Sequence, residues 1–340
     1  MLGLLADYGL FVAKLVTVLA LLVVAAVAVA GAARREREGT EHLEVRRLGE
    51  RYDRMQRQIR NATLSRRELR RAARQDRRER KAHGAETPRR RVFVLSFKGD
   101  LRASAVAALR EEVSAVLASA QDGDEVLLRL ENGGGTVHEH GLAASQLLRL
   151  KRRGIRLTVA VDKIAASGGY MMACVADHVV AAPFAVLGSI GVLLQLPNFN
   201  RLLDANGVDF EQIKGGEYKR TLTLFGRNTE EERERARDHV TQIHGLFKDF
   251  VHEHRPRLVL DEVATGEHWY GRQALELGLC DALGTSDDYL LEARADAELL
   301  ELRWVARGGL VERIGGALSG AVDRARSALH GRAQPGEPLI

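Results

Sequence analysis

The sequence predicts an α/β protein in which a globular domain follows an N-terminal transmembrane helix and a charged stalk. Between residues 92 and 161, stretches typical of strands alternate with stretches typical of helices, which is the pattern of parallel β–α–β units. The first 33 residues carry only two charged side chains, whereas residues 34–91 carry 21 basic and 10 acidic ones. A chain of 340 residues is long enough for one large domain with both appendages.

The segment 1–33 is predicted to be an uncleaved membrane anchor. Nineteen residues without a charge run from Leu15 to Ala33 and are followed directly by Arg34 and Arg35. Together with the apolar residues before it, this run is long enough to span a bilayer. The alternative is a cleaved signal peptide, because Ala28-Val29-Ala30 resembles a cleavage site. The length of the run and the basic residues after it favour the anchor.

The segment 34–90 is predicted to be a basic charged stalk. Stretches such as Glu41–Arg80 suit a solvated helix with pairs of opposite charges one turn apart. Interleaved acidic residues and a single aromatic residue, Tyr52, argue against nucleic-acid binding. The segment is either a simple charged stalk or one that also contacts anionic lipid headgroups. The positive-inside rule would place this segment in the cytoplasm, but the sequence leaves open on which side of the membrane the globular domain lies.

The globular domain is predicted to span residues 91–300. Strands are expected at 92–97, 125–130 and 157–161, with helices at 103–120 and 142–152 between them. Since parallel strands end at one edge of a sheet, functional residues are expected where these strands end.

The second half of the domain is predicted from breaks in an apolar pattern. Residues 179–194 are apolar enough to resemble a second membrane span, but Pro183, Gly188 and Gly191 interrupt them, so we expect buried strand and loop. Thr229 and Glu232 form a capping box that begins a helix with one apolar stripe. A short helix is expected near residues 272–276. The tail 301–340 has a helical apolar face, and the sequence leaves open whether it lies on a membrane.

Ser167 is the candidate nucleophile. It lies between a predicted strand and an apolar helical run, in Ala165-Ala166-Ser167-Gly168-Gly169. A serine at such a junction exposes its hydroxyl near the free N–H groups of the helix, which favour developing negative charge. The pattern is not the G-x-S-x-G motif of α/β-hydrolases, because Ala165 replaces the first glycine. Taken alone, a turn of small residues is more often only a turn.

A glycine run, Asn132-Gly133-Gly134-Gly135, follows the preceding strand. Such a run can direct backbone N–H groups toward an oxyanion, although a flexible loop is the simpler interpretation. Both this loop and Ser167 are expected at the same edge of the parallel sheet. Their proximity strengthens the functional interpretation of each motif.

The general base is less obvious from the residues. His138, His140 and His178 lie near the two motifs, so a Ser–His pair stays open, although surface or structural roles are the simpler account. Only eight of the 51 basic residues are lysines, and a desolvated lysine can lose its proton whereas arginine cannot. His252 and His254 lack the spacing of a helical zinc pair, so no metal is expected.

Several motifs in a fixed order resemble peptidase family S49, the family of signal peptide peptidase A. The resemblance covers nearly the whole chain, including the anchor and the stalk. The motifs are Asp162-Lys163-Ile164-Ala165-Ala166-Ser167-Gly168-Gly169-Tyr170, Gly188-Ser189-Ile190-Gly191-Val192, Pro197-Asn198-Phe199-Asn200, Tyr218-Lys219-Arg220 and Ala264-Thr265-Gly266-Glu267-His268-Trp269-Tyr270-Gly271.

The resemblance implies a ClpP/crotonase-like β–α spiral and a role for each matching residue. The family nucleophile corresponds to Ser167, its general base to Lys219, and the hydroxyl that orients the base to Ser189. The N–H groups of Gly134 and Gly168 correspond to the oxyanion hole. The implied protein is a serine endopeptidase of the bacterial inner membrane. It needs no metal or cofactor, cleaves extended polypeptides and forms a ring-like homo-oligomer.

The loop departs from the family pattern, which reads Ser-Pro-Gly-Gly where this chain has Asn132-Gly133-Gly134-Gly135. Loss of the proline should loosen the loop and lower activity. Two alternatives therefore stay open. One is a catalytically weak or silent membrane scaffold of the same fold, and the other is a crotonase-like enzyme acting on CoA thioesters, which would need neither the anchor nor Ser167.

Overall fold

The computed structural model describes residues 14, 17, 41–82, 90–216, 219 and 222–305. The chain divides into two compact units, residues 45–303 and residues 1–44 with 304–340. Apart from Lys14 and Thr17, the predicted anchor lies outside the described residues, as does the tail after residue 305. Among the residues that are described, no helix is both long enough and apolar enough to cross a bilayer.

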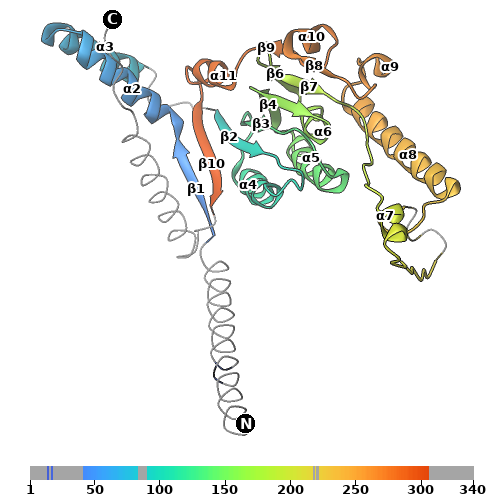
Figure 1. Ribbon diagram of the computed structural model, residues 1–340. Helices are drawn as coiled ribbons and strands as arrows, with labels where there is room; N and C mark the ends of the chain where they lie inside the picture. Colours follow the sequence, from blue (N-terminus) through green and yellow to red (C-terminus); the bar gives the residue numbers. More distant parts are fainter. Residues whose placement is uncertain are drawn as a thin grey trace, which may run out of the picture. The chain divides into compact units, whose positions relative to one another are not determined.

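Strands and helices alternate through most of the larger unit (Figure 1). The strands are β1 (His42–Arg47), β2 (Arg91–Lys98), β3 (Glu125–Glu131), β4 (Arg156–Val161), β5 (Ile164–Ala166), β6 (His178–Ala181), β7 (Val186–Gly188), β8 (His268–Tyr270), β9 (Ala282–Leu283) and β10 (Glu298–Val305). The helices are α2 (Leu48–Thr63), α3 (Arg66–Ala82), α4 (Val106–Ser119), α5 (Val137–Arg152), α6 (Gly168–Ala173), α7 (Asn200–Ala205), α8 (Glu230–His254), α9 (Leu260–Val263), α10 (Gly271–Glu276) and α11 (Ser286–Ala293).

The main sheet has seven strands in the order β1-β10-β2-β3-β4-β6-β9. The pairs from β10 through β9 are all parallel. A second sheet has the order β5-β7-β8, in which β5 and β7 are parallel and β7 and β8 antiparallel. The predicted α/β class with parallel β–α–β units is therefore confirmed.

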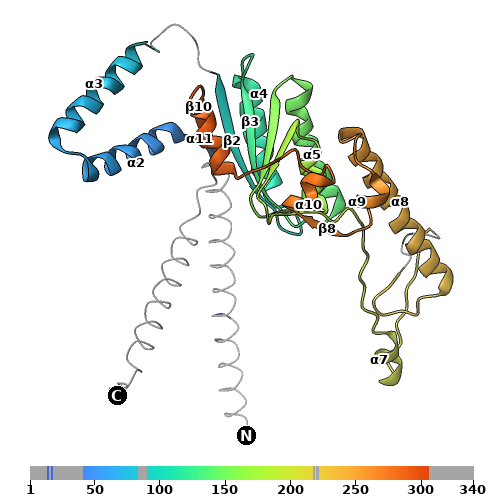
Figure 2. The same cartoon turned by 90° about the horizontal axis from the view of Figure 1, so that it is seen from above.

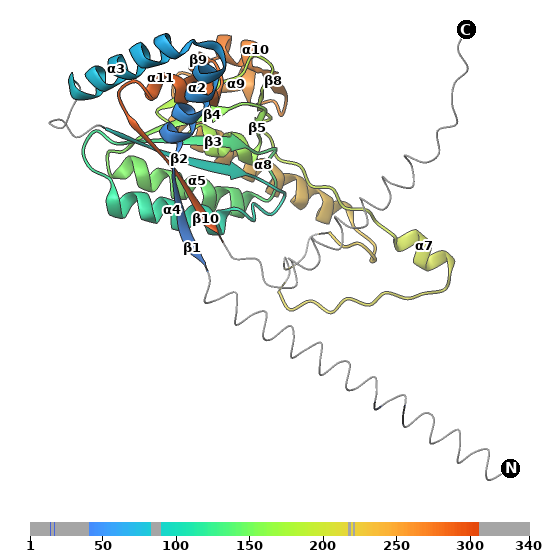
Figure 3. The ribbon, with the colours of Figure 1, turned by 90° about the vertical axis from the view of Figure 1, so that its left-hand side faces the viewer.

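Apolar side chains alternate between the two faces of the main sheet. On one face, Val92 and Val94 of β2 belong to a buried cluster with Leu290 of α11 and Leu48 of α2. Helices α4 and α5 pack together on the opposite face (Figure 3). Successive side chains of a strand point to opposite faces, so a strand covered on both sides is apolar at nearly every position. β2 is of this kind, since five of its residues are almost fully buried.

The predicted strands at 92–97, 125–130 and 157–161 correspond to β2, β3 and β4. The helix predicted at 142–152 begins earlier, at Val137, directly after the glycine loop. The capping box of Thr229 and Glu232 is present at the start of α8, with Glu232 N–H donating to the Thr229 hydroxyl at 3.2 Å. β6 and β7 are mostly buried as expected, but the apolar stretch ends in Leu193 and Leu194, which are 75% and 54% exposed.

The segment predicted as a stalk contains more than solvated helix. Residues 42–47 form strand β1, which the charge pattern did not indicate. Helix α2 then contributes Leu48 and Tyr52 to the buried cluster, and Arg294 forms an ion pair with Asp53. In Figure 2, α2 and α3 are the blue helices that precede β2 in the chain. The beginning of α2 therefore packs on the globular domain.

The described residues between 192 and 228, called the arm below, form an extended segment that carries the short helix α7 (Figure 2). Phe199 N–H donates to the Leu224 carbonyl at 2.7 Å, and the Asn198 amide donates to the Thr223 carbonyl at 2.9 Å. These bonds tie the two sides of the arm together. Phe199 and Phe225 stack with ring centroids 6.1 Å apart.

Candidate active site

Backbone hydrogen bonds bring the glycine loop and the serine motif together. Asn132, directly after β3, forms an isolated parallel bridge with Ala165 of β5, and its N–H donates to the Ile164 carbonyl at 2.8 Å. Ser167 N–H donates to the carbonyl of Gly188, the last residue of β7, also at 2.8 Å. The ends of β3, β5 and β7 therefore meet at Ser167, as the parallel pattern leads one to expect.

Ser167 has a strained backbone between β5 and α6. Its φ is 53° and its ψ is −120°, a region that residues with a side chain rarely adopt. Such strain costs about 1–3 kcal/mol and persists only where neighbouring contacts hold it, which is common at active sites. Here the bond to Gly188 holds the Ser167 nitrogen, and Met171 N–H donates to the Ser167 carbonyl at 3.0 Å. The side chain belongs to a half-buried residue and is not covered by the core.

Gly134 lies directly against Ser167. A Cβ placed on Gly134 would be 2.7 Å from Ser167 Cβ and 2.9 Å from Gly168 N. The φ of Gly134 is 89°, so both its conformation and this close approach require glycine. Gly168 N–H has no hydrogen-bond acceptor among the described residues. The two glycines expected to bind an oxyanion are therefore neighbours, on either side of the candidate nucleophile.

The Gly134 N–H group is not free in this structure. It donates to Asn132 Oδ1 at 2.9 Å. The same oxygen lies 3.2 Å from His140 Nε2, and the Asn132 Nδ2 group donates to Met172 Sδ at 3.3 Å. The loop is thus held by the Asn132 side chain, a contact that the sequence interpretation missed.

His140 is one of the histidines that the sequence left open as a partner for Ser167. It is fully buried on α5, and its ring packs on Gly168 so closely that a Cβ there would be 2.4 Å from His140 Cγ. Its Nδ1 atom lies 2.9 Å from the Thr136 carbonyl oxygen. Both ring nitrogens therefore have partners, so His140 is not available as a general base for Ser167. The only sequence signal was its position eight residues after Asn132, at the start of a helix.

Ser189 directly follows Gly188, whose carbonyl accepts the hydrogen bond from Ser167 N–H. Its N–H donates to the Glu267 carbonyl at 2.6 Å, and its φ is 50°, a second strained position beside the first. It is half-buried. The structure thus places Ser189 one residue from the Gly188 carbonyl that binds Ser167 N–H.

Lys219 is exposed and lies on the arm. Its described contact is a long backbone hydrogen bond to the Gly216 carbonyl, at 3.4 Å. In the part of the chain that the structure describes, no hydrogen bond joins Lys219 to Ser167 or to Ser189. The neighbours on which its predicted motif depends, Tyr218 and Arg220, lie outside the described residues.

The other candidate bases have partners or lie in the open. Lys163 is exposed and forms an ion pair with Glu131 at 3.2 Å. His178 lies 3.9 Å from Asp281, and the His138 side chain is 80% exposed.

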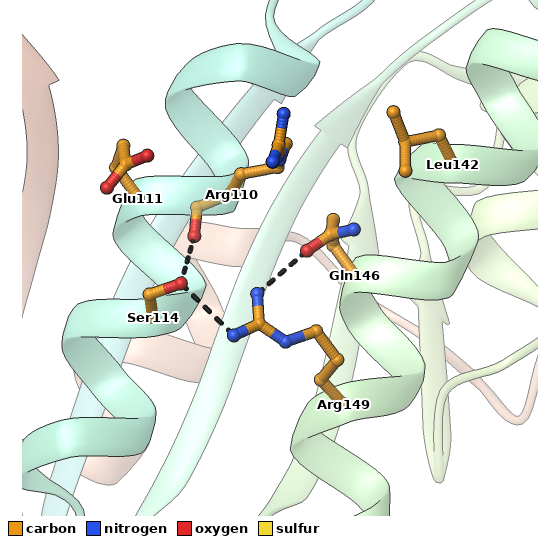
Figure 4. A pocket seen from close by; sticks show the side chains of 6 residues that line it. All are labelled: Arg110, Glu111, Ser114, Leu142, Gln146 and Arg149. Carbon is orange, nitrogen blue, oxygen red and sulfur yellow. Dashed lines mark hydrogen bonds between the residues drawn. The ribbon is translucent and has the colours of Figure 1, made fainter.

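A hollow of about 510 Å³ lies on the α4–α5 face and contains none of the predicted catalytic residues (Figure 4). Arg149 spans it, donating to Gln146 Oε1 at 2.8 Å and to Ser114 Oγ at 3.1 Å. Because Arg149 of α5 bridges to Ser114 of α4 across it, we interpret the hollow as the seam between two packed helices.

Comparison with known proteins shows the family to which the chain belongs. The chain belongs to peptidase family S49: residues 3–147 match the model "Peptidase family S49 N-terminal" and residues 149–300 match "Peptidase family S49". A protein of Haemophilus influenzae named "Probable protease SohB" is 43% identical over 324 residues, which is 92% of each chain. A protein of the same name from Buchnera aphidicola subsp. Acyrthosiphon pisum is 55% identical over 225 residues, 66% of this chain and 67% of that one. The family predicted from the motifs is confirmed.

Solved structures of the 1510-N membrane-bound stomatin-specific protease are also similar. The one in complex with a substrate peptide is 12% identical with a TM-score of 0.43, covering 63% of this chain and 93% of that chain.

Proposed function

We propose that this chain is a membrane-anchored serine endopeptidase in which Ser167 is the nucleophile and Lys219 the general base. Membership of a peptidase family supports the reaction class. The observation that carries the proposal is the strained Ser167 at the junction of three strand ends, with Gly134 packed against it.

The proposed reaction is acyl transfer. The Ser167 hydroxyl attacks the peptide carbonyl carbon while its proton passes to Lys219 Nζ, and the N–H groups of Gly134 and Gly168 stabilise the oxyanion. The leaving amine takes the proton back from Lys219. Lys219 then activates water, which hydrolyses the acyl-enzyme. The Ser189 hydroxyl orients the lysine amine.

Lys219 must be neutral to accept a proton, and removal from water favours the neutral amine. In the single chain Lys219 is exposed to solvent. Its amine would be removed from water only if another polypeptide covered the arm. The arm carries exposed apolar side chains such as Leu202 and Ile213, at 60% and 97% exposure, which a substrate or a second copy of the chain would cover. We therefore infer that Lys219 becomes an effective base only when a substrate or a second copy of the chain covers the arm.

The proposed substrates are extended polypeptides with small or apolar side chains. Ala165, Ala166 and the glycines around Ser167 leave room for a backbone to approach closely. The predicted anchor at residues 1–33 would hold the site near the inner membrane, where signal-peptide remnants and membrane-associated proteins are found. The crotonase-like β–α spiral implied by the motifs is consistent with the two sheets.

A second candidate function is a catalytically weak or silent scaffold of the same fold. Two observations favour it: the Gly134 N–H group is bound to Asn132, and Lys219 is exposed. Activity measurements decide between the two candidates.

The test uses the full-length protein in detergent or lipid, with a fluorophosphonate probe and with β-casein. We expect Ser167→Ala to abolish labelling and Lys219→Arg to reduce hydrolysis by about 1,000-fold or more, because arginine keeps the charge but cannot take up a proton. Lys163→Ala is the matched control and should retain activity. Hydrolysis that persists in Lys219→Arg would overturn the choice of base, and no Ser167-dependent reaction in the wild type would favour the scaffold.

A further inference from the structure

We propose that the second half of helix α2 is a membrane-contact surface, which lies on a bilayer that contains anionic lipid. The inference goes beyond the proposed function, because this surface holds none of the proposed catalytic residues. The charge pattern of the sequence left open whether the segment touches lipid. The side chains that the structure leaves uncovered assign that role to one face of one helix.

Helix α2 has a single apolar stripe. Leu48, Tyr52, Met55 and Ile59 follow one another at intervals of three or four residues, which places all four on the same face of a helix. A helix of a globular protein normally covers such a stripe along its whole length by packing it on the core. The stripe of α2 is therefore expected to have a partner from Leu48 to Ile59.

The globular domain covers only the first half of the stripe, through Leu48 and Tyr52. Arg294, directly after α11, lies over the Tyr52 ring at 5.9 Å from its centroid and forms an ion pair with Asp53. Met55 and Ile59, farther along the same face, are 47% and 64% exposed. One end of the helix is thus fixed on the domain, while the apolar face of the other end is open.

The carboxylates of residues 48–75 have partners within the protein. Glu50 pairs with Arg47 at 3.9 Å, and Asp53 forms the ion pair described above. Glu68 accepts hydrogen bonds from the Ser65 N–H group at 2.8 Å and from the Ser65 hydroxyl at 2.7 Å. These carboxylates are therefore engaged and do not neutralise the arginines around them.

Most arginines of the same residues have no such partner. Among the described residues, the structure gives no ion pair to eight exposed arginines of α2 and α3: Arg51, Arg54, Arg57, Arg66, Arg67, Arg70, Arg71 and Arg74. The open half of the apolar stripe therefore lies on a helix with a strong excess of positive charge.

An anionic bilayer surface complements both features. The boundary between headgroups and acyl chains accepts the aliphatic side chains of a helix that lies flat, and lipid phosphates attract its arginines. A second copy of the chain that met the same face would bring arginines against arginines. Nucleic acid fits less well, because bases stack on aromatic rings and the only ring of the stripe, Tyr52, packs on the domain.

The contact gives the globular domain a second attachment to the membrane. The predicted anchor at residues 1–33 would already hold the chain at the bilayer, so α2 reaches the lipid within one molecule and at a high effective concentration. Two exposed apolar side chains and a few arginines are enough under that condition. Two attachments also limit how the domain turns relative to the bilayer.

The test uses the full-length protein reconstituted in vesicles, with the environment-sensitive fluorophore NBD attached at Ile59→Cys. The native Cys174 and Cys280 are buried, so the label goes to the new thiol. In vesicles of phosphatidylcholine mixed with phosphatidylglycerol, we expect blue-shifted emission that spin-labelled lipid quenches. In vesicles of phosphatidylcholine alone, both effects should be largely lost, because the arginines have no anionic headgroups to bind.

Asn61→Cys is the matched control, since residue 61 is exposed and lies on the opposite face of the same helix. Its label should keep the emission of an aqueous probe in both kinds of vesicle. Replacing Arg51, Arg54 and Arg57 together by glutamine should lower the ratio of docked to undocked α2 by about 100-fold, at roughly fivefold for each arginine. Thermal unfolding confirms that each variant is folded.

Equal emission from the labels at positions 59 and 61, or equal quenching with and without phosphatidylglycerol, would overturn the proposal. Protection of the Ile59 label that grows with the protein-to-lipid ratio would overturn it too, because it would assign the stripe to a second copy of the chain. The same signals are expected in Ser167→Ala, so the result does not depend on the proposed hydrolysis.

Discussion

At the scale of single residues, Gly134 is the position where the site depends most on the absence of a side chain. Its φ of 89° and its approach to Ser167 both exclude a Cβ, which would lie 2.7 Å from Ser167 Cβ and 2.8 Å from the Ala166 carbonyl oxygen. Gly133 next to it differs, because a Cβ there would meet only Ile164 Cδ1, at 3.7 Å. The close packing therefore requires glycine at position 134 but leaves room for a side chain at position 133.

We expect Gly134→Ala to lower kcat by about 100-fold or more, because relief of the clash would move the loop N–H away from the carbonyl that Ser167 attacks. Hydrolysis of β-casein and fluorophosphonate labelling measure the loss. Gly133→Ala is the control and should keep most of the activity. Equal activity in the two variants would contradict the placement of Gly134 against the nucleophile.

At the scale of elements, the buried carboxylate of Asp124 joins the start of β2 to the turn before β3. It accepts hydrogen bonds from Arg91 N–H at 2.9 Å and from Gln121 N–H at 2.8 Å, and it pairs with the Arg91 guanidinium at 2.5 Å. Burial alone would raise the pKa of Asp124, but these bonds outweigh it and hold the pKa below its usual value. Since β2 is central to the sheet that positions the glycine loop, this contact supports the site from a distance.

We expect Asp124→Asn to lower the free energy of unfolding by about 2 kcal/mol at neutral pH, the usual worth of hydrogen bonds to a charged group. The folded-state pKa is lower than the unfolded one, so this stabilisation is fully present above about pH 4 and is lost as pH falls through the folded-state value. Urea unfolding at several pH values measures it, and Asp124→Asn should lose less stability in acid than the wild type does. Asp122→Asn, at an exposed neighbour, serves as the control. An identical acid loss in wild type and Asp124→Asn would contradict the assignment.

At the scale of the whole molecule, the parts needed for the proposed activity are distributed along the chain. The proposed nucleophile and the glycines proposed to bind the oxyanion lie in the sheet domain. The proposed base lies on the exposed arm, and the predicted anchor lies in the first 33 residues. Phe199, Phe210 and Phe225 form an aromatic cluster within the arm, with centroids 6.1 and 5.8 Å apart. This cluster keeps the arm folded on itself while apolar side chains beyond it stay exposed.

Deletion of residues 1–33 should move the protein from the membrane fraction to the supernatant, because about 20 apolar residues are what a helix needs to cross a bilayer. Immunoblots of membranes washed with alkaline carbonate distinguish the two forms. Deletion of residues 306–340 is the control and should leave the protein in the membrane fraction. Retention of the shortened protein after the carbonate wash would show that residues 1–33 are not the principal anchor.

The parallel sheet and the meeting of two motifs at its edge were predictable, since periodicity reports burial and parallel strands end together. Strand β1 was not, because its six residues alternate too weakly within a charged segment to indicate a buried partner. The contact of His140 with Asn132 was not predictable either. A histidine at the start of a helix has no pattern that distinguishes a buried ring from a solvated one.

The sequence by itself determined the α/β class, the peptidase family and the candidate roles of Ser167, Gly134 and Gly168, because strand periodicity and ordered motifs are local properties. Only the tertiary structure decided that Gly134 N–H is bound to Asn132, that His140 lies behind this pair, and that Lys219 is exposed in a single chain. The first two are side-chain contacts between the end of β3, the glycine loop and the start of α5, and the third is the absence of such a contact around Lys219 among the described residues. Such contacts depend on how the strands and helices pack, and no local pattern of residues records that.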